Sequence, residues 1–292
     1  ATGAVDAAWT PLYRKDGLFG FSDQTWTEPE LPEGNNEFVG IQDILDVSID
    51  PTNPNHVVFS SYEEGLVELL NGKVVRILND ENSSLSLTSV AGTPRPAVSG
   101  LDFDVAGNLW FTNPKVGTPL HVMLPDGTTR GMDLGSAGQN LLLGDVEVTR
   151  DGYVWVVIPN GGGLLVYDPA GTPSNPNDDD WVLLRGDAGE GGLPSNDVFC
   201  VEEDLDNEVW VGTSKGPAIF YQSASVFEPD VNASQILISQ DGNLQYLLET
   251  ETIQSIIIDA GNRKWVGTQG SGVFVLAPDG LTTDHHFTTE NS

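Results

Sequence analysis

The chain has 292 residues, and its 12 Lys and Arg stand against 43 Asp and Glu, which gives a formal net charge of −31. This balance argues against nucleic acid as a partner, because phosphate binding needs clustered cations, and it suits a well-solvated exposed surface. No apolar run approaches the ~20 residues that a membrane-spanning helix needs. The lone Cys200, inside an apolar run, excludes an intrachain disulfide and is expected to be a buried thiol.

A short phrase recurs along the chain: an apolar run, an acidic residue, a turn with Gly or Asn, and a strand centred on Trp. Its anchors are Val58, in the Trp position of a degenerate copy, then Trp110, Trp155, Trp210 and Trp265. A period of roughly 45 to 55 residues with several short strands in each unit is typical of β-propeller blades. We expect the Trp side chains to pack between adjacent sheets rather than to stack on sugars.

The repeat predicts an all-β chain, a β-propeller with four-stranded blades in a single domain over residues 1–292. The units are a partial one at about 7–33 and full ones at 42–80, 98–134, 143–185, 195–241 and 253–289. In the 195–241 unit we expect strands at 197–202, 208–213, 217–221 and 235–239. No segment keeps a 3.6-residue apolar period, so helix content should be low.

The two ends of the chain bear on how the propeller closes. The partial unit has candidate strands at 7–13, 17–21 and 24–27 but lacks a first strand, and the chain stops where the next inner strand should begin. We therefore expect five full blades and one partial blade of a six- to seven-bladed ring, in a piece of a longer protein.

Motifs that carry chemistry are weak in this sequence. The segment 212–216 formally matches G-x-S-x-G, but it joins strand to strand, whereas a nucleophile elbow joins strand to helix. The segment from Asp204 begins like a calcium loop, but Val209 and Lys215 stand where Gly and Glu are required. We expect neither catalytic residues nor a cofactor. Asp178, Asp179 and Asp180 are weak candidates for a hard cation, and a solvated acidic loop is the preferred interpretation.

A binding surface can be predicted from propeller topology. Loops between the second and third strands and loops from the fourth strand to the next blade open on the same face. The polar candidates in these loops are Tyr62, Asn113, Lys115, Asn160, Ser195, Asn196, Lys215 and Gln269. Lys115 and Lys215 occupy equivalent loops and could donate to an anionic glycan. The alternative is that all of these are ordinary polar turn residues.

Several phrases of the chain resemble a known repeat. They are Leu193–Val198, Glu208–Thr213 and Arg263–Thr268, which resemble the two-component regulator propeller repeat of Bacteroidetes proteins. A second set narrows the resemblance to the propeller region of PorZ-like proteins: Val98–Asp104, Gly192–Asn196, Gln245–Glu251, Gly261–Trp265, Gly270–Phe274 and His286–Ser292. These matches extend over most of residues 9–292.

The resemblance implies a non-catalytic accessory component of the type IX secretion system, exported to the outer surface of the cell. Its implied partners are anionic lipopolysaccharide or another glycan, a sortase, and other surface proteins of the secretion system. The alternative is the extracellular ligand sensor of a hybrid two-component system that recognises polysaccharide products. A third class, a propeller enzyme such as a metal-dependent lactonase or a lyase, would need acidic or His ligands on the ring axis, and the sequence gives no sign of them. Propellers host all three activities, so the fold alone does not choose.

Overall fold

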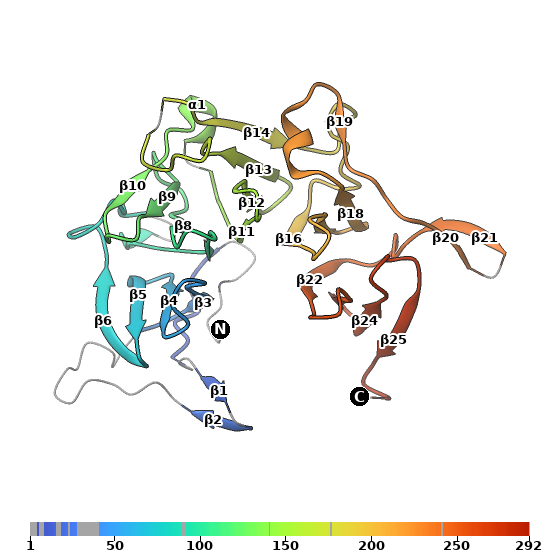
Figure 1. The fold of residues 1–292 in the computed structure, drawn as a ribbon, viewed down its shortest axis with the longest axis horizontal. Helices are drawn as coiled ribbons and strands as arrows, with labels where there is room; N and C mark the ends of the chain where they lie inside the picture. Colours follow the sequence, from blue (N-terminus) through green and yellow to red (C-terminus); the bar gives the residue numbers. More distant parts are fainter. Residues whose placement is uncertain are drawn as a thin grey trace. The chain divides into compact units, whose positions relative to one another are not determined.

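The computed structural model of the 292-residue chain describes residues 5, 9–15, 19–22, 24–27, 41–88, 92–139, 141–175, 177–240 and 242–291. Two compact units emerge: residues 1–148 with 172–176, and residues 149–171 with 177–292. Antiparallel strands make up almost all of the regular structure (Figure 1).

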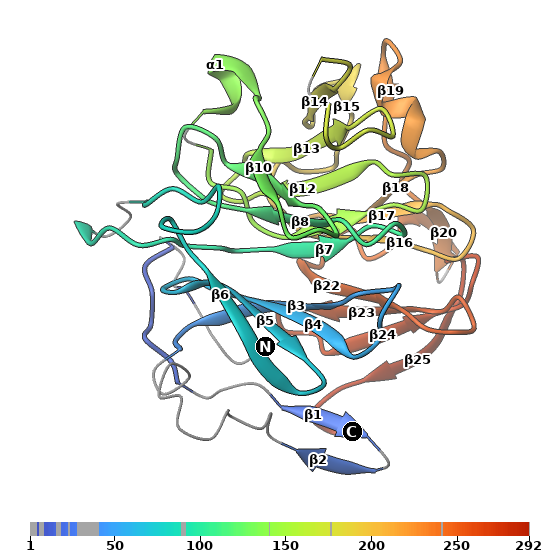
Figure 2. The ribbon, with the colours of Figure 1, turned by 60° about the vertical axis from the view of Figure 1, so that its left-hand side comes forward.

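The first unit contains two complete four-stranded antiparallel sheets. One has β3 (Ile44–Ile49), β4 (His56–Ser61), β5 (Gly65–Leu70) and β6 (Lys73–Leu78) in chain order, as Figure 2 shows. The other has β7 (Leu101–Phe103), β8 (Leu109–Thr112), β9 (Leu120–Met123) and β10 (Thr129–Gly131), again in chain order. β11 (Val146–Val148) and the four-residue helix α1 (Gly135–Gly138) follow them. A shared core of apolar side chains, among them Leu66, Leu78 and Phe111, packs the two sheets together.

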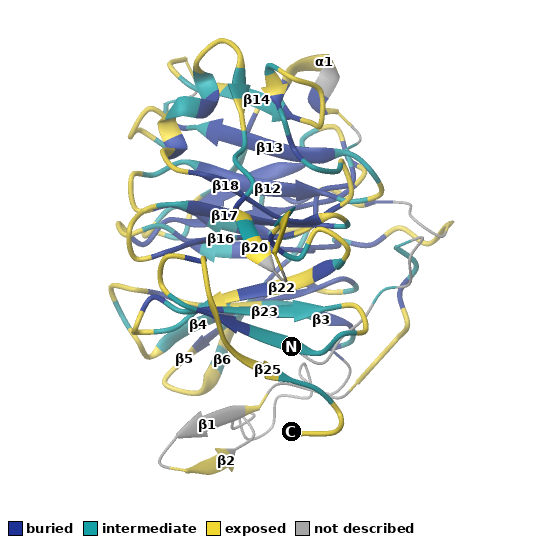
Figure 3. Ribbon diagram, turned by 90° about the vertical axis from the view of Figure 1, so that its right-hand side faces the viewer, coloured by how far each residue is buried: buried dark blue, intermediate teal, exposed yellow. Residues whose placement is uncertain are grey.

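The second unit continues the same meander. It has β12 (Val154–Ile158), β13 (Gly163–Asp168) and β14 (Asp180–Leu184), then β16 (Val198–Glu203), β17 (Val209–Thr213) and β18 (Gly216–Phe220), and finally β22 (Ile253–Ile258), β23 (Lys264–Thr268), β24 (Val273–Leu276) and β25 (Thr283–Phe287). The short strands β15 (Glu190–Gly191) and β19 (Val231–Asn232) pair in parallel, and a 3₁₀ turn covers Ser223–Phe227. Figure 3 shows that β12 and β13 are buried, whereas β25 at a sheet edge is largely exposed.

The acidic residue of the recurring phrase organises the turn that follows it. The carboxylate of Asp204 accepts the backbone N–H groups of Asp206 (2.8 Å) and Glu208 (3.0 Å). Equivalent pairs of bonds are made by Asp104 and by Asp259. In two copies the other carboxylate oxygen accepts a hydrogen bond from the indole N–H of the Trp six residues later. These bonds run from Trp210 to Asp204 and from Trp265 to Asp259. In these two copies the six-residue spacing from Asp to Trp thus places the indole N–H on the carboxylate that also holds the turn.

The glycine of the Trp-Val-Gly-Thr phrase marks a close approach to the neighbouring inner strand. A Cβ atom on Gly212 would lie 2.4 Å from Cys200 Sγ and 2.9 Å from Ile253 Cγ2. A Cβ atom on Gly267 would lie 2.5 Å from Ser255 Oγ. No larger side chain fits at either position without a shift, so the glycine of the repeat serves packing.

Most of the predicted strands are confirmed, and so are the low helix content and the buried Cys200. Trp110, Trp155 and Trp210 are fully buried, as expected for packing residues. The strand predicted at 235–239 overlaps β20 (Leu237–Gln240), but its place as the outer strand of the 195–241 sheet was predicted wrongly. β20 pairs with β21 (Asn243–Tyr246) as a separate hairpin, and on the edge of β18 away from β17 the described pairing is an isolated bridge from Ile219 to Ser234.

Of the partial N-terminal unit, the structure describes a hairpin, β1 (Gly20–Ser22) with β2 (Thr25–Thr27), and a bridge between Val5 and Pro11. The predicted strands at 7–13 and 17–21 fall partly outside the described residues. The single-domain boundary and the number of blades in the ring stay predictions.

Candidate functional site

Three of the predicted ligand-binding residues lie in the first unit, and two of them are fully buried. Tyr62 follows β4, Asn113 follows β8, and both have 0% exposure. The Asn113 amide is fully engaged, since its Oδ1 accepts the Ser86 N–H at 2.8 Å and its Nδ2 donates to the Ala97 carbonyl at 2.8 Å. Asn113 thus ties the loop after β8 to the chain that precedes β7.

Tyr62 has a different environment. Its hydroxyl has no hydrogen-bond partner, and burial raises its pKa to about 12, with the Arg95 charge opposing and the Glu63 charge adding to the shift. Arg95 is itself buried and ion-pairs with Glu63. The Trp9 ring lies 6.1 Å from the Tyr62 ring, centroid to centroid. Tyr62 therefore presents no surface of its own in this structure.

The second unit brings the remaining predicted residues into connected loops. The Gly163 N–H, just after Asn160, donates to the Asn196 carbonyl at 3.0 Å, and the Ser214 hydroxyl, next to Lys215, donates to Ser195 Oγ at 2.8 Å. The Gln269 N–H donates to the Thr252 carbonyl at 2.9 Å. Each loop between the second and third strands thus contacts the chain that enters an inner strand. This is the topological arrangement from which the surface was predicted, although whether it binds a ligand stays a prediction.

Lys115 and Lys215 are both exposed, and their loops are held by the backbone. Lys115 has a φ of 60° and its N–H donates to the Leu141 carbonyl at 2.9 Å. The Lys215 N–H donates to Thr213 Oγ1 at 3.0 Å. Neither ammonium group forms an ion pair with a described residue, whereas Arg76, Arg95, Arg150, Arg263 and Lys264 all do. The two lysines are thus available to an external anion.

The acidic segment before β14 is used within the fold. The Tyr167 hydroxyl donates to Asp179 Oδ2, and Asp180 Oδ1 accepts the Trp181 N–H at 2.8 Å. Among the described residues, no group of three His, Cys, Asp or Glu side chains is placed to hold a metal ion. Likewise, none of the described helices is long and apolar enough to cross a membrane.

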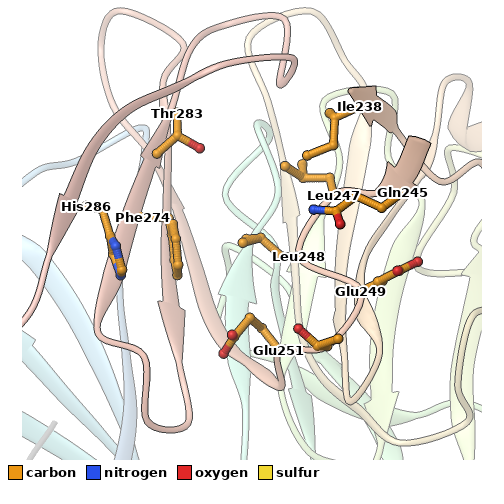
Figure 4. Close-up of a pocket in the computed structure, with 10 residues that line it drawn as sticks. Ile238, Gln245, Leu247, Leu248, Glu249, Glu251, Phe274, Thr283 and His286 are labelled. Atoms are coloured by element: carbon orange, nitrogen blue, oxygen red, sulfur yellow. The ribbon is translucent and has the colours of Figure 1, made fainter. Parts of the chain in front are cut away.

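A pocket that the sequence did not reveal lies in the second unit. It has a volume of about 450 Å³ and is bounded by the β20–β21 hairpin, the turn at 247–251 and the strands β24 and β25 (Figure 4). An adjoining hollow of about 430 Å³ shares Ile238, Leu247 and Thr283 with it. The volume falls within the usual range for ligand pockets, about 300 to 1,000 Å³. The pocket exists because β20 pairs with β21 and not with β18, and no local sequence signal predicts this pairing.

Known proteins show the same fold. No family model matches the chain, and no curated protein matches it in sequence. Among solved structures, PorZ, an essential bacterial surface component of the type IX secretion system of Porphyromonas gingivalis, is 26% identical with a TM-score of 0.72 over 86% of this chain. The extracellular domain of the hybrid two-component system BT3049 from B. thetaiotaomicron is 15% identical with a TM-score of 0.60 over 95% of this chain.

Virginiamycin B lyase from Staphylococcus aureus is 12% identical with a TM-score of 0.55, and the match covers 85% of this chain and 71% of the lyase. The chain spans about a third of the length of the first two proteins, 34% of PorZ and 33% of the BT3049 domain. These likenesses confirm the prediction of an all-β propeller fold built from four-stranded antiparallel sheets. The chain resembles a secretion-system surface component, and it shares its fold with the extracellular domain of the BT3049 system.

Proposed function

We propose that this chain is a non-catalytic binding and scaffold propeller, exposed at the bacterial surface, that serves type IX secretion and binds anionic lipopolysaccharide. The observation that carries the proposal is the similarity to PorZ, at 26% identity over 86% of the chain. The sortase and other secretion-system surface proteins are proposed partners on the same ground.

The contact with the anionic ligand would be made by lysines in equivalent loops. Lys115 and Lys215 are exposed, and neither is paired with a described carboxylate, so each can donate to a phosphate or carboxylate of a glycan. Because the chain carries a net charge of −31, an anionic ligand must bind close to such cations and would be repelled elsewhere.

The test is calorimetry with purified anionic lipopolysaccharide, with neutral lipopolysaccharide as the comparison, at low and high salt. We expect the protein to bind the anionic form selectively and more weakly at high salt. Lys115→Ala and Lys215→Ala should each weaken binding about fivefold, because a partly exposed ion pair contributes about 1 kcal/mol. Lys73→Ala is the matched control. Lys73 is exposed and begins β6, after the turn between the third and fourth strands of its sheet. That turn lies at the opposite end of the strands from a loop between second and third strands, the kind of loop that carries Lys115. Equal losses from Lys73→Ala and Lys115→Ala would overturn the proposal.

A second candidate is the extracellular sensor of a two-component system. The match to the BT3049 domain covers 95% of the chain, more than the match to PorZ covers. Neutral oligosaccharides from plant polysaccharides in the same titrations distinguish the two candidates. Binding of oligosaccharides without binding of anionic lipopolysaccharide would favour the sensor.

A further inference from the structure

The β20–β21 hairpin interrupts the outer edge of its sheet. Ile219 and Ser234 exchange two backbone hydrogen bonds of 2.8 Å, after which the chain leaves β18 for the hairpin. The hairpin closes at its base, where the Leu247 N–H donates to the Ile236 carbonyl at 2.8 Å. Figure 1 shows the hairpin reaching away from β16, β18 and β22. Since a two-stranded hairpin has little stability alone, its open faces favour a partner.

One face of the hairpin forms a wall of the 450 Å³ pocket. Ile238 and Gln245 are cross-strand neighbours and both line it, and Leu247 and Leu248 extend the apolar surface. Phe274 stands opposite, with the His286 ring stacked on it at 3.9 Å between centroids (Figure 4). The His286 Nε2 atom lies 2.6 Å from the Ser271 carbonyl, so this side chain is already engaged. The pocket therefore offers apolar contact with one aromatic wall.

The charge of the pocket is negative at one end. Glu249 and Glu251 lie there together, and none of the described lining residues is Lys or Arg. Glu249 Oε2 accepts the Tyr246 N–H at 3.2 Å, whereas the Glu251 carboxylate forms no ion pair with a described residue. The Glu251 backbone is fixed by the Gly216 N–H, which donates to its carbonyl at 3.0 Å. A carboxylate carried on a hydrogen-bonded turn beside apolar surface fits a cation attached to an apolar group.

We propose that this pocket binds an extended peptide segment of a partner protein, in which an Arg or Lys side chain pairs with Glu251 and a neighbouring apolar side chain packs on Ile238 and Leu248. Charge complementarity selects this occupant, since two carboxylates repel anionic ligands and the chain as a whole is strongly acidic. Neither Lys115 nor Lys215 lines the pocket, and the proposal uses neither lysine, so it does not rest on the lipopolysaccharide proposal.

The test uses fluorescence anisotropy with three labelled peptides of one design: Gly-Ser-Arg-Leu-Arg-Leu-Gly-Ser, and versions with Gln or Glu in place of Arg. We expect the Arg peptide to bind and the Glu peptide not to bind. Glu251→Gln should weaken the Arg peptide about fivefold and leave the weaker Gln peptide unchanged. Glu249→Gln should have a smaller effect, because Glu249 is already engaged with the backbone.

Two matched controls separate the pocket from general attraction to an acidic protein. Glu228→Gln removes the same charge from an exposed residue of the same unit that does not line the pocket. Ile238→Thr keeps a β-branched residue in β20 and should weaken binding about threefold or more, whereas Leu244→Thr, on the opposite hairpin face and 73% exposed, should not. The proposal is overturned if Glu228→Gln and Glu251→Gln weaken binding equally, if Leu244→Thr matches Ile238→Thr, or if the Glu peptide binds as well as the Arg peptide.

Discussion

Lys264 and Asp204 form a fully buried ion pair, with 2.7 Å between Lys264 Nζ and Asp204 Oδ2 and 0% exposure of both side chains. It joins the turn after β16 to the strand β23 of the next sheet. The ammonium group also donates to the Asn262 and Pro278 carbonyls and lies 5.0 Å from the centre of the Trp210 ring. Burial alone would raise the pKa of Asp204, but hydrogen bonds from Lys264 and from backbone amides hold it below its usual value.

Removal of one partner of this ion pair should be costly. Lys264→Met leaves Asp204 buried without its cation, so the free energy of unfolding should fall by about 3 kcal/mol. The double variant with Asp204→Asn should recover part of that loss, because the uncompensated charge is gone and an amide oxygen still accepts the turn N–H groups. Urea denaturation of both variants measures the two values, and a double variant no better than Lys264→Met would contradict this account.

Asp102 should make stability depend on pH in mildly acidic solution. Burial raises its pKa to about 6, hydrogen bonds from Val148 and Ser48 oppose the shift, and the Asp46 carboxylate adds to it. The folded protein therefore holds a proton that the unfolded chain releases above pH ~4, so stability falls as the pH rises from ~4 to ~6, by on the order of 1–3 kcal/mol.

Asp102→Asn is the variant that isolates this effect, since it keeps the size of the side chain and an oxygen for the Val148 N–H. We expect its stability to change less than that of the native chain between pH 4 and 6. Denaturation midpoints across that range provide the measurement. Parallel pH profiles of the two proteins would show that Asp102 does not titrate in this window.

Gly212→Ala should disturb the contact between neighbouring sheets. The added methyl group would overlap Cys200 Sγ and Ile253, and both belong to the core between β16 and β22. A loss of about 1–3 kcal/mol is expected from overpacking. Gly171→Ala is a control without such an overlap, though its φ of 69° adds backbone strain. The comparison uses thermal unfolding, and the packing interpretation is wrong if Gly212→Ala is neutral.

Tyr62→Phe should be neutral or slightly stabilising, by up to about 1 kcal/mol, because the buried hydroxyl has no hydrogen-bond partner to lose. Chemical denaturation checks the stability, and titration with anionic lipopolysaccharide checks the binding role predicted for Tyr62. A clear loss of stability would mean that the hydroxyl is satisfied in solution, for example by a bound water.

The repeat, most of the strands and the turns between them could be predicted from the amino-acid sequence, because they depend on local chemistry. Asp204, five residues before β17, accepts the N–H groups of the turn and the indole N–H of Trp210, so this spacing is readable along the chain. The exposed loop lysines were also found by position in the repeat.

Contacts between residues of different sheets depend on the whole fold, so the local sequence did not predict them. Nothing in the local sequence distinguishes Lys264 from other strand residues, yet in the fold its Nζ lies 2.7 Å from Asp204 Oδ2. Tyr62 was predicted to lie in a binding loop, whereas the fold buries it completely. The β20–β21 hairpin and its pocket were missed because the apolar run at 235–239 suits either partner strand. Strand pairing depends on which neighbouring strand offers the better long-range contacts. The local hydrophobic pattern therefore does not predict which strand will be the partner.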